Sequence, residues 1–484
     1  MEESPIKKTL KHLIALLLAT GMLTSAVACA RGDDPKETEA STQGGTTVSE
    51  EDTSYKPDID KTDYKAEFNF LNCSSILDDE LFWVDETKRG DPMSDAVYER
   101  AININDHLGV TLKLIQEPDD YATEIRTLVQ AGEDAYQLVM THGLSGAGTL
   151  VSGNCLYNYA NFEDVNLSAP YWNQDIMEDA KYGDRYLLGY GDFSLSHVHA
   201  LIFNKDMMRE YNIKEPYQLV DNQKWTLDQF TSIASTVAKD NGDGTWDEFD
   251  TYGLTGWCGT YLTSFLVGAG LNVIENDGDG NYYLAYPKHI EKLNDLADKL
   301  IAMNNADYTY LWDGADPTVD FTAGTTLFQF YDAADLAILR SSTVRFGVVP
   351  FPKWDEAQED YRCLSMNGLM AVPSVIKNPA MVGQTLELLG YYTAPVKVAF
   401  YEDLLGSKLS EAPDDARMLD VIWTHQIFDP IMLTADRGSQ MTDAFYFMSS
   451  QVSNGQNTIS SKLKGMEKSV NNTLKNFYKK ADSN

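Results

Sequence analysis

Residues 66–75 read AEFNFLNCSS, an alternation of apolar and polar side chains that is typical of a strand ending in small polar residues. VTLKL (residues 110–114) and AYQLVM (residues 135–140) are further strand-like runs, and a helical pattern precedes each of them. Strands that alternate with helices predict a largely parallel α/β sheet. These residues therefore predict the α/β fold class.

The helical pattern between the first two strands has recognisable ends. Ser94 is a candidate N-cap and Gly109 a candidate stop. The residues that share its apolar face are Val97, Ala101, Ile104 and Leu108. The second pattern ends near Gly132. Its inward-facing residues are Ile125, Leu128 and Val129.

Loops that follow parallel strands gather at one edge of the sheet, where ligands bind. Residues 72–75 and residues 141–148, THGLSGAG, fall at this edge. The second loop approaches the G-x-S-x-G pattern of a hydrolase nucleophile, but Ala147 occupies the position of the final glycine. We therefore interpret it as a glycine-rich loop after a strand.

The same alternation starts afresh in the second half of the chain. RYLLGYGDFSLSHVHALIFNK (residues 185–205) predicts a pair of strands, and a helix opens at Thr226. The segments that continue the pattern and predict a second α/β lobe are YGLTG (252–256), a helix through Phe265, a hairpin at NDGDGN (276–281), a helix over 287–303, TLFQF (326–330) and FGVVPFP (346–352). SMNGLMAVP (365–373) and a helix after Asn378 supply one more strand and helix, and the end from about Arg417 is helical and polar.

The first residues predict export. Basic residues precede the apolar run LIALLLATGML, which is too short to span a membrane comfortably, and the small residues SAVAC follow it. The sequence AVAC resembles a bacterial lipobox, which favours lipidation of Cys29 over simple secretion, although Ala26 stands where such boxes more often carry leucine. The polar and acidic run after Cys29 predicts a disordered tether.

Composition excludes several classes of function. The chain has 484 residues, and its 38 basic and 73 acidic side chains give a formal net charge of −35, which argues against nucleic acid as a partner. With 43% hydrophobic residues, the chain can still bury large cores. The five cysteines form no C-x-x-C pair, so neither a zinc ribbon nor a dithiol redox site is indicated.

Two features raise the question of metal. His197 and His199 have the period of a strand and share one face, but with no third ligand nearby we interpret them as packing or hinge residues. DNGDGTWDEFD (residues 240–250) resembles a calcium loop whose ligands would be Asp240, Asp243, Asp247 and Asp250. Lys239 stands where the first Asp belongs and Asp250 replaces the usual Glu, so a solvated acidic turn is favoured over a structural calcium site, and no other cofactor is expected.

The order of several segments resembles the extracellular solute-binding proteins of bacterial ABC importers, in particular the sugar-binding group related to maltose-binding protein. The segments that carry this resemblance are LIFNKDMMREYNIKEPYQL (201–219), KWTLDQF (224–230), YGLTG, VGAGLNV (267–273) with its DGDG hairpin, YPKHIEKLNDL (286–296), FTAGTTLFQFYDAADLAILR (321–340), FGVVPFPK (346–353) and SMNGLMAVPSVIKNPAMVGQTLELLGYYT (365–393).

The resemblance implies a periplasmic-binding-protein-like type II fold: two α/β lobes joined by crossover strands, with a ligand cleft between them. It places a hinge near Asn204 and a return crossing near Pro350 to Pro352. The boundaries expected are a lipoprotein signal peptide over 1–28, lipidated Cys29 and an acidic tether over 29–63, first-lobe residues 64–204, second-lobe residues 205–352, a first-lobe return over 353–405, and C-terminal helices, mainly of the second lobe, over 406–484.

The resemblance also implies a noncatalytic receptor, monomeric and held to the membrane through its lipid only, that delivers a carbohydrate to ABC transporter permease subunits. Sugar rings present an apolar face to aromatic side chains and a rim of hydroxyls to polar ones. The residues expected to line the cleft are Trp83, His142, Asp192, Trp257, Tyr261, Tyr331, Asp332 and Asn367. A secreted glycoside hydrolase, or the same fold with a peptide or metal chelate as ligand, stays open as an alternative.

Overall fold

The computed structural model describes residues 55–72, 79–84, 86–116, 121–194, 197–312, 319–366, 368–406, 412–435 and 439–479. The predicted signal peptide, Cys29 and most of the predicted tether lie outside these residues, as does Asn367. In the part of the chain that is described, no helix combines the length and the apolar character needed to cross a membrane.

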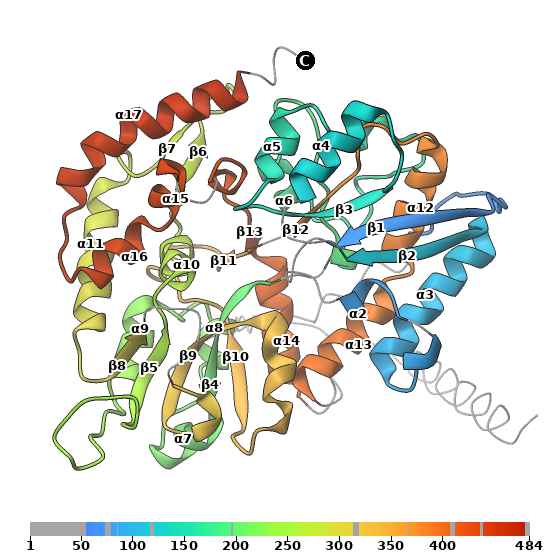
Figure 1. Ribbon diagram of the computed structural model, residues 1–484. Helices are drawn as coiled ribbons and strands as arrows, with labels where there is room; N and C mark the ends of the chain where they lie inside the picture. Colours follow the sequence, from blue (N-terminus) through green and yellow to red (C-terminus); the bar gives the residue numbers. More distant parts are fainter. Residues whose placement is uncertain are drawn as a thin grey trace, which may run out of the picture. The chain divides into compact units, whose positions relative to one another are not determined.

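Two mixed sheets organise the chain (Figure 1). The first has the order β12-β3-β1-β2, and the second has the order β10-β4-β9-β5-β8. Their strands are β1 (Ala66–Asn72), β2 (Val110–Gln116), β3 (Leu138–His142) and β12 (Gly368–Ala371) in the first sheet, and β4 (His199–Asn204), β5 (Tyr252–Trp257), β8 (Thr309–Trp312), β9 (Thr326–Asp332) and β10 (Phe346–Val349) in the second. The expected α/β fold class with two lobes is confirmed.

Helices pack on each sheet to form a lobe. Those of the first lobe are α2 (Asp79–Phe82), α3 (Pro92–Leu108), α4 (Tyr121–Ala131), α5 (Ala147–Ser152), α6 (Gln174–Asp179), α12 (Pro379–Tyr391) and α13 (Ala394–Leu405). Those of the second are α7 (Lys205–Glu210), α8 (Tyr217–Asp221), α9 (Leu227–Ala234), α10 (Thr260–Gly268), α11 (Ile290–Asn304), α14 (Pro413–Thr424), α15 (Gln440–Phe445), α16 (Phe447–Ser453) and α17 (Ile459–Tyr478). Two short pairings complete the set: β6 (Ile274–Asn276) with β7 (Tyr282–Leu284), and β11 (Cys363–Leu364) with β13 (Gln426–Ile427).

Helix α3 shows how local sequence sets an element. It ends at Gly109 as predicted, because this residue adopts the left-handed conformation with φ of 63°. Its start was predicted one turn too late. Asp91, not Ser94, is the N-cap: the Asp91 carboxylate accepts a hydrogen bond from the Ser94 N–H, and Pro92 occupies the first turn, where no N–H is needed.

The position of the first crossing differs from the prediction. β4 belongs to the second sheet, so Asn204 lies at the far end of a buried strand and is not a hinge. The Asn204 side chain accepts hydrogen bonds from the N–H groups of Asp206 and Met207 and thereby caps α7. The chain crosses before His199, between the 3-10 helix η3 (Asp192–Ser194) and β4.

Of the strand pair predicted over residues 185–205, only β4 forms a ladder. Gly189 and Gly191 make isolated bridges to Met370 and Trp172 instead. The return crossing also comes later than expected, because Lys353 still exchanges backbone hydrogen bonds with Trp225 and Leu227 of the second lobe.

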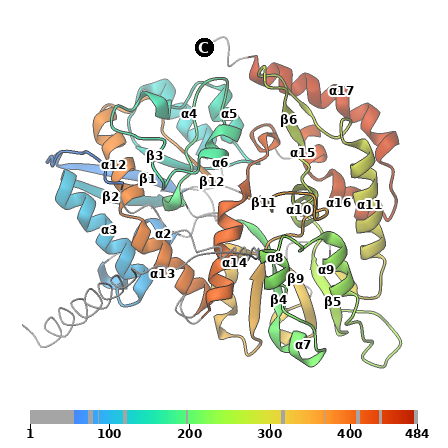
Figure 2. The same cartoon turned by 180° about the vertical axis from the view of Figure 1, so that it is seen from behind.

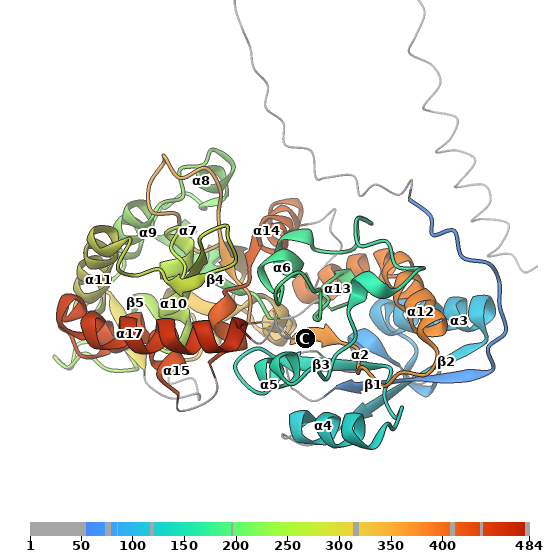
Figure 3. The same cartoon turned by 90° about the horizontal axis from the view of Figure 1, so that it is seen from above.

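Helix α17 packs beside β7 and α15. Figures 2 and 3 show α17 and α15 side by side from two directions. Its last turn reaches the first lobe. The Tyr182 hydroxyl, on a fully buried side chain, donates to the Phe477 carbonyl at 2.6 Å, and the two rings meet edge to face. The C-terminal helices therefore contact both lobes.

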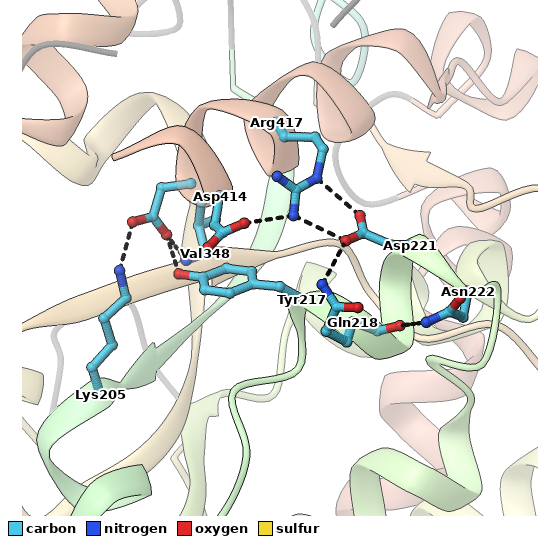
Figure 4. Close-up of polar contacts among 9 residues, drawn as sticks. Lys205, Tyr217, Gln218, Asp221, Asn222, Val348, Asp414 and Arg417 are labelled. Atoms are coloured by element: carbon cyan, nitrogen blue, oxygen red, sulfur yellow. Dashed lines mark hydrogen bonds and ion pairs between the residues drawn. The ribbon is translucent and has the colours of Figure 1, made fainter. Parts of the chain in front are cut away.

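A buried polar cluster fixes α14 to the second sheet (Figure 4). Asp415 is 5% exposed and accepts hydrogen bonds from Lys205 (2.6 Å), from Val348 N–H (3.3 Å) and from the Tyr217 hydroxyl. Burial beside this carboxylate raises the pKa of Tyr217, so the phenol stays a donor. The Asp415 carboxylate of α14 thus holds together hydrogen-bond donors from α7, α8 and β10.

We expect Asp415→Ala to lower the free energy of unfolding by about 3 kcal/mol, because it leaves the Lys205 ammonium without its partner in a largely buried site. Urea denaturation measures this difference. Asp414→Ala is the matched control: Asp414 is exposed and pairs with Arg417 at 2.7 Å, so its loss should cost less than about 1 kcal/mol. Equal losses for the two variants would contradict the role of the buried cluster.

Candidate functional site

A cavity of about 300 Å³ lies where the two lobes meet. The described residues that line it are His142, Leu144, His197, His199, Trp257, Thr260, Asp332, Met366, Ala435, Thr442 and Tyr446. They come from the first lobe, the second lobe, two crossing segments and the C-terminal helices. A molecule bound here would contact all of these parts at once.

Three of the residues predicted from the sequence meet in this cavity. His142 ends β3, Trp257 ends β5 and Asp332 ends β9. All three are the last residues of parallel strands, which is why they gather at facing edges of the two sheets. His142 is further held by its own loop, because its Nδ1 accepts a hydrogen bond from Leu144 N–H at 3.0 Å.

Four other predicted residues are placed elsewhere. Trp83 packs half-buried against the core after α2, and Asp192 forms an ion pair with Lys397 at 3.4 Å. Tyr261 lies behind the cavity wall, where its ring stacks on His199 and on Phe330. Tyr331 precedes Asp332 and is half-buried, but it is not a lining residue.

Five polar and aromatic lining residues were not among the ligand contacts expected from the sequence. These are His197, His199, Thr260, Thr442 and Tyr446. The two-residue period of the histidines correctly placed both on one face, and that signal could have found them. Thr442 and Tyr446 lie more than one hundred residues after β9, and no local pattern marks their approach to the site.

Asp332 connects the cavity to the first crossing segment. Its Oδ1 accepts hydrogen bonds from Val198 N–H (3.2 Å) and Ala334 N–H (3.0 Å), and its Oδ2 lies 2.9 Å from His197 Nδ1. The side chain is 9% exposed. Asp332 therefore ties the end of β9 to the segment that enters β4, and it also lines the cavity.

His199 is a neutral polar group in the wall of the site. It is 3% exposed, and its ring shares hydrogen bonds with the hydroxyls of Ser264 (2.7 Å) and Thr260 (3.4 Å). Burial lowers the pKa of His199 to about 4, an effect that the nearby Asp332 only partly opposes. One face of the ring is stacked on Tyr261, with centroids 4.3 Å apart.

The indole of Trp257 is the main aromatic surface of the cavity. It is half-buried and meets Tyr261 edge to face, with centroids 6.3 Å apart. Gly259 lies directly against it, since a Cβ at that position would come within 2.2 Å of the indole. The glycine thus leaves room for the ring at the start of α10.

Among the described residues, no three His, Cys, Asp or Glu side chains are grouped so that they could hold a metal ion. In the acidic turn, Asp240, Asp243, Asp247 and Asp250 accept hydrogen bonds from backbone N–H groups of the turn itself. These bonds lower the pKa of Asp240. The turn is closed by its own side chains, and of its four carboxylates Asp243 is exposed whereas Asp250 is fully buried.

The pKa of His199 predicts how stability depends on pH. An unfolded histidine titrates near pH 6.5, so below about pH 6.5 the unfolded chain binds a proton that the folded chain excludes until about pH 4. This residue should therefore reduce the free energy of unfolding as the pH falls from about 6.5 to 4, by an amount on the order of 2 to 3 kcal/mol.

Denaturation of His199→Asn across this range should show a shallower slope than the wild type. A slope that His199→Asn leaves unchanged would mean that the imidazole already carries its proton in the folded chain.

Comparison with known proteins yields no matching family model and no matching curated protein. Solved structures do match. A substrate-binding protein of an ABC transporter from Listeria monocytogenes, in complex with cycloalternan, has a TM-score of 0.56 and 13% identity over 84% of this chain and 99% of its own.

The GacH receptor of Streptomyces glaucescens, described unliganded and with acarbose, gives a TM-score of 0.52 and 12% identity over 86% of this chain and 98% of its own. A solute-binding protein of an ABC transporter from Thermotoga lettingae, bound to α-D-tagatose, has a TM-score of 0.52 and 13% identity over 84% of this chain and 100% of its own. The chain therefore has the periplasmic-binding-protein type II fold of ABC-transporter solute-binding proteins.

Proposed function

We propose that this chain is a noncatalytic solute-binding protein that captures a carbohydrate between its lobes and delivers it to an ABC transporter. The observation that carries the proposal is the cavity at the facing strand ends, where an indole stands beside a carboxylate, imidazoles and hydroxyls. A ligand in this position contacts both lobes, so its binding favours the closed arrangement over the open one.

The chemistry of the lining suits a sugar. The Trp257 ring can cover the apolar face of a pyranose, while Asp332, His142, Thr260 and the Tyr446 hydroxyl can pair with its hydroxyls. The net charge of −35 disfavours an anionic ligand. A volume of about 300 Å³ lies at the lower end of small-molecule pockets, which fits a short saccharide or one part of an oligosaccharide.

The described residues that line the cavity supply one carboxylate, which disfavours the hydrolase alternative. Glycoside hydrolysis needs two carboxyl groups at a defined separation. Among the described lining residues only Asp332 has one, and it is already engaged with His197 and two backbone N–H groups. A peptide or a metal chelate as cargo stays an alternative, but three of the matching solved structures are described with cycloalternan, acarbose and α-D-tagatose, which favours carbohydrate.

A thermal shift screen of the mature protein tests the function. The panel should contain maltotriose, mannotriose, cycloalternan, acarbose and α-D-tagatose, together with a tripeptide and a siderophore as representatives of the alternatives. A ligand present at about 100 times its dissociation constant adds roughly 2.7 kcal/mol to the free energy of unfolding, which raises the melting temperature measurably. Stabilisation by the peptide or the chelate alone would replace the carbohydrate proposal.

Trp257→Ala should weaken binding of the stabilising sugar by about 5- to 150-fold, because an indole stacked on a sugar ring contributes roughly 1 to 3 kcal/mol. Calorimetry measures the affinity and circular dichroism the fold. Tyr331→Ala is the control, since Tyr331 is half-buried nearby but does not line the cavity. Equal losses for the two variants, or none for Trp257→Ala, would place the sugar elsewhere.

We further infer that the protein is exported and anchored by lipid on Cys29, with permease subunits as its protein partners. The apolar leader and the AVAC sequence support the anchor, because a cysteine at this position can carry the diacylglycerol of a bacterial lipoprotein. Two or three acyl chains hold a protein durably on a bilayer, at about 0.8 kcal/mol per buried methylene.

Replacement of Cys29 by Ala should move the protein from the membrane fraction to the medium, or leave an unprocessed precursor. Immunoblotting of cell fractions and mass spectrometry of the mature amino terminus measure the change. If Cys29→Ala fractionates with membranes and has the wild-type amino terminus, the lipobox interpretation fails.

A further inference from the structure

A second and larger cavity, of about 1410 Å³, lies apart from the site described above. It is bounded by residues 178–185 of the first lobe, by the hairpin of β6 and β7, and by the last turns of α17. The two cavities share no lining residue among those described. We propose that this cavity is a second saccharide-binding site, a ligand class that rests on the proposed function.

The Asp179 carboxyl, at the end of α6, lines the cavity and is half-buried. It receives no hydrogen bond from any described residue, and burial with Asp429 nearby raises its pKa to about 7. Arg185 also lines the cavity, and it donates through Nη1 to Asn154 at 3.2 Å. A partly buried carboxyl without a hydrogen-bond donor is a group that a ligand or water is expected to satisfy.

An aromatic surface accompanies these groups. The rings of Tyr282 and Tyr478 stack with centroids 3.7 Å apart and planes inclined by 8°. Tyr478 covers one face of Tyr282, yet Tyr282 is only half-buried and lines the cavity. The uncovered part of this ring is a surface on which the apolar face of a sugar can lie.

The charges of the lining favour a neutral ligand. Carboxylates such as Glu178 and Glu275 stand beside cations such as Lys181 and Lys475, so an ion of either sign meets a like charge. A polyhydroxylated molecule both donates and accepts hydrogen bonds, so its hydroxyls can pair with the Asp179 carboxyl and with lining charges of either sign. A saccharide does this without placing a net charge in the cavity.

Calorimetry with maltotriose and with mannotriose tests the proposal on the mature protein. We expect two molecules of one of these sugars per chain. Asp179→Asn and Tyr282→Ala should each weaken one of the two events at least fivefold and leave the other unchanged, whereas Trp257→Ala should have the reverse effect. Asp175→Asn, an exposed carboxylate of the same helix that does not line the cavity, is the matched control and should bind as the wild type does.

A single bound sugar whose affinity neither Asp179→Asn nor Tyr282→Ala changes would overturn the second site and leave the proposed function intact. Binding of neither probe to any variant would count against both. If Tyr282→Ala unfolds the protein, Asp179→Asn, which keeps the shape of the side chain, decides the matter alone.

Discussion

The structure depends on an exchange of strands between its two sheets. β4 leaves the first lobe and pairs antiparallel with β9, in the register that sets His199 opposite Asp332, and β12 returns to pair antiparallel with β3. Every other pairing within the first sheet is parallel, and so are those of β5 with β8 and β9. The first sheet is thus completed by residues that follow the whole of the second, and neither lobe is a continuous piece of chain.

This exchange is also what forms the candidate site. Because β4 and β9 run in opposite directions, the start of one lies beside the end of the other, and the crossing segment is brought against the carboxylate of Asp332. A side chain that closes a strand end therefore also holds a connection between lobes. Ligand contacts and lobe geometry are linked through the same few hydrogen bonds, without any need for a separate signalling path.

Local sequence patterns predicted the helices and strands well, but they predicted the crossings between the lobes poorly. Alternation and glycine stops located β1, α3 and β2, since these depend on neighbours in sequence. Asp91 and Ser94 are both residue types that favour the N-cap position. Only Pro92, which suits the first turn of a helix, indicates that the helix begins after Asp91. Asn204 carried no signal that distinguishes a hinge from a helix cap. Successive side chains of a strand point to opposite faces, so the sequence could have shown that Asp332 and Tyr331 of β9 do not both face the cavity.

The remaining lining residues of the site could not be predicted, because they lie far along the chain from the strand ends that they meet. Tyr446 reaches the cavity only because α15 and α16 pack on the second lobe, and no pattern in a single sequence encodes that docking. Trp83 and Asp192 were expected in the cleft because they lie in or beside loops at strand ends. In the structure, Trp83 packs against the core and Asp192 forms an ion pair with Lys397. The strand ends were predictable from the fold. Which side chains turn inward was decided by tertiary packing.

Three cysteines are free and buried in the described part of the chain. One lies in the first lobe, one in the second lobe and one in the return crossing between the lobes. Cys155 follows α5 in the first lobe, Cys258 follows Trp257 in the second, and Cys363 lies in β11 on the return crossing. Burial raises the pKa of Cys155, and that of Cys363 to about 12. A thiol reagent needs an accessible thiolate, so each cysteine should react only when its own surroundings open. The rates of alkylation at these positions would therefore report, within one unlabelled molecule, which lobe loosens first and whether the crossing opens with it.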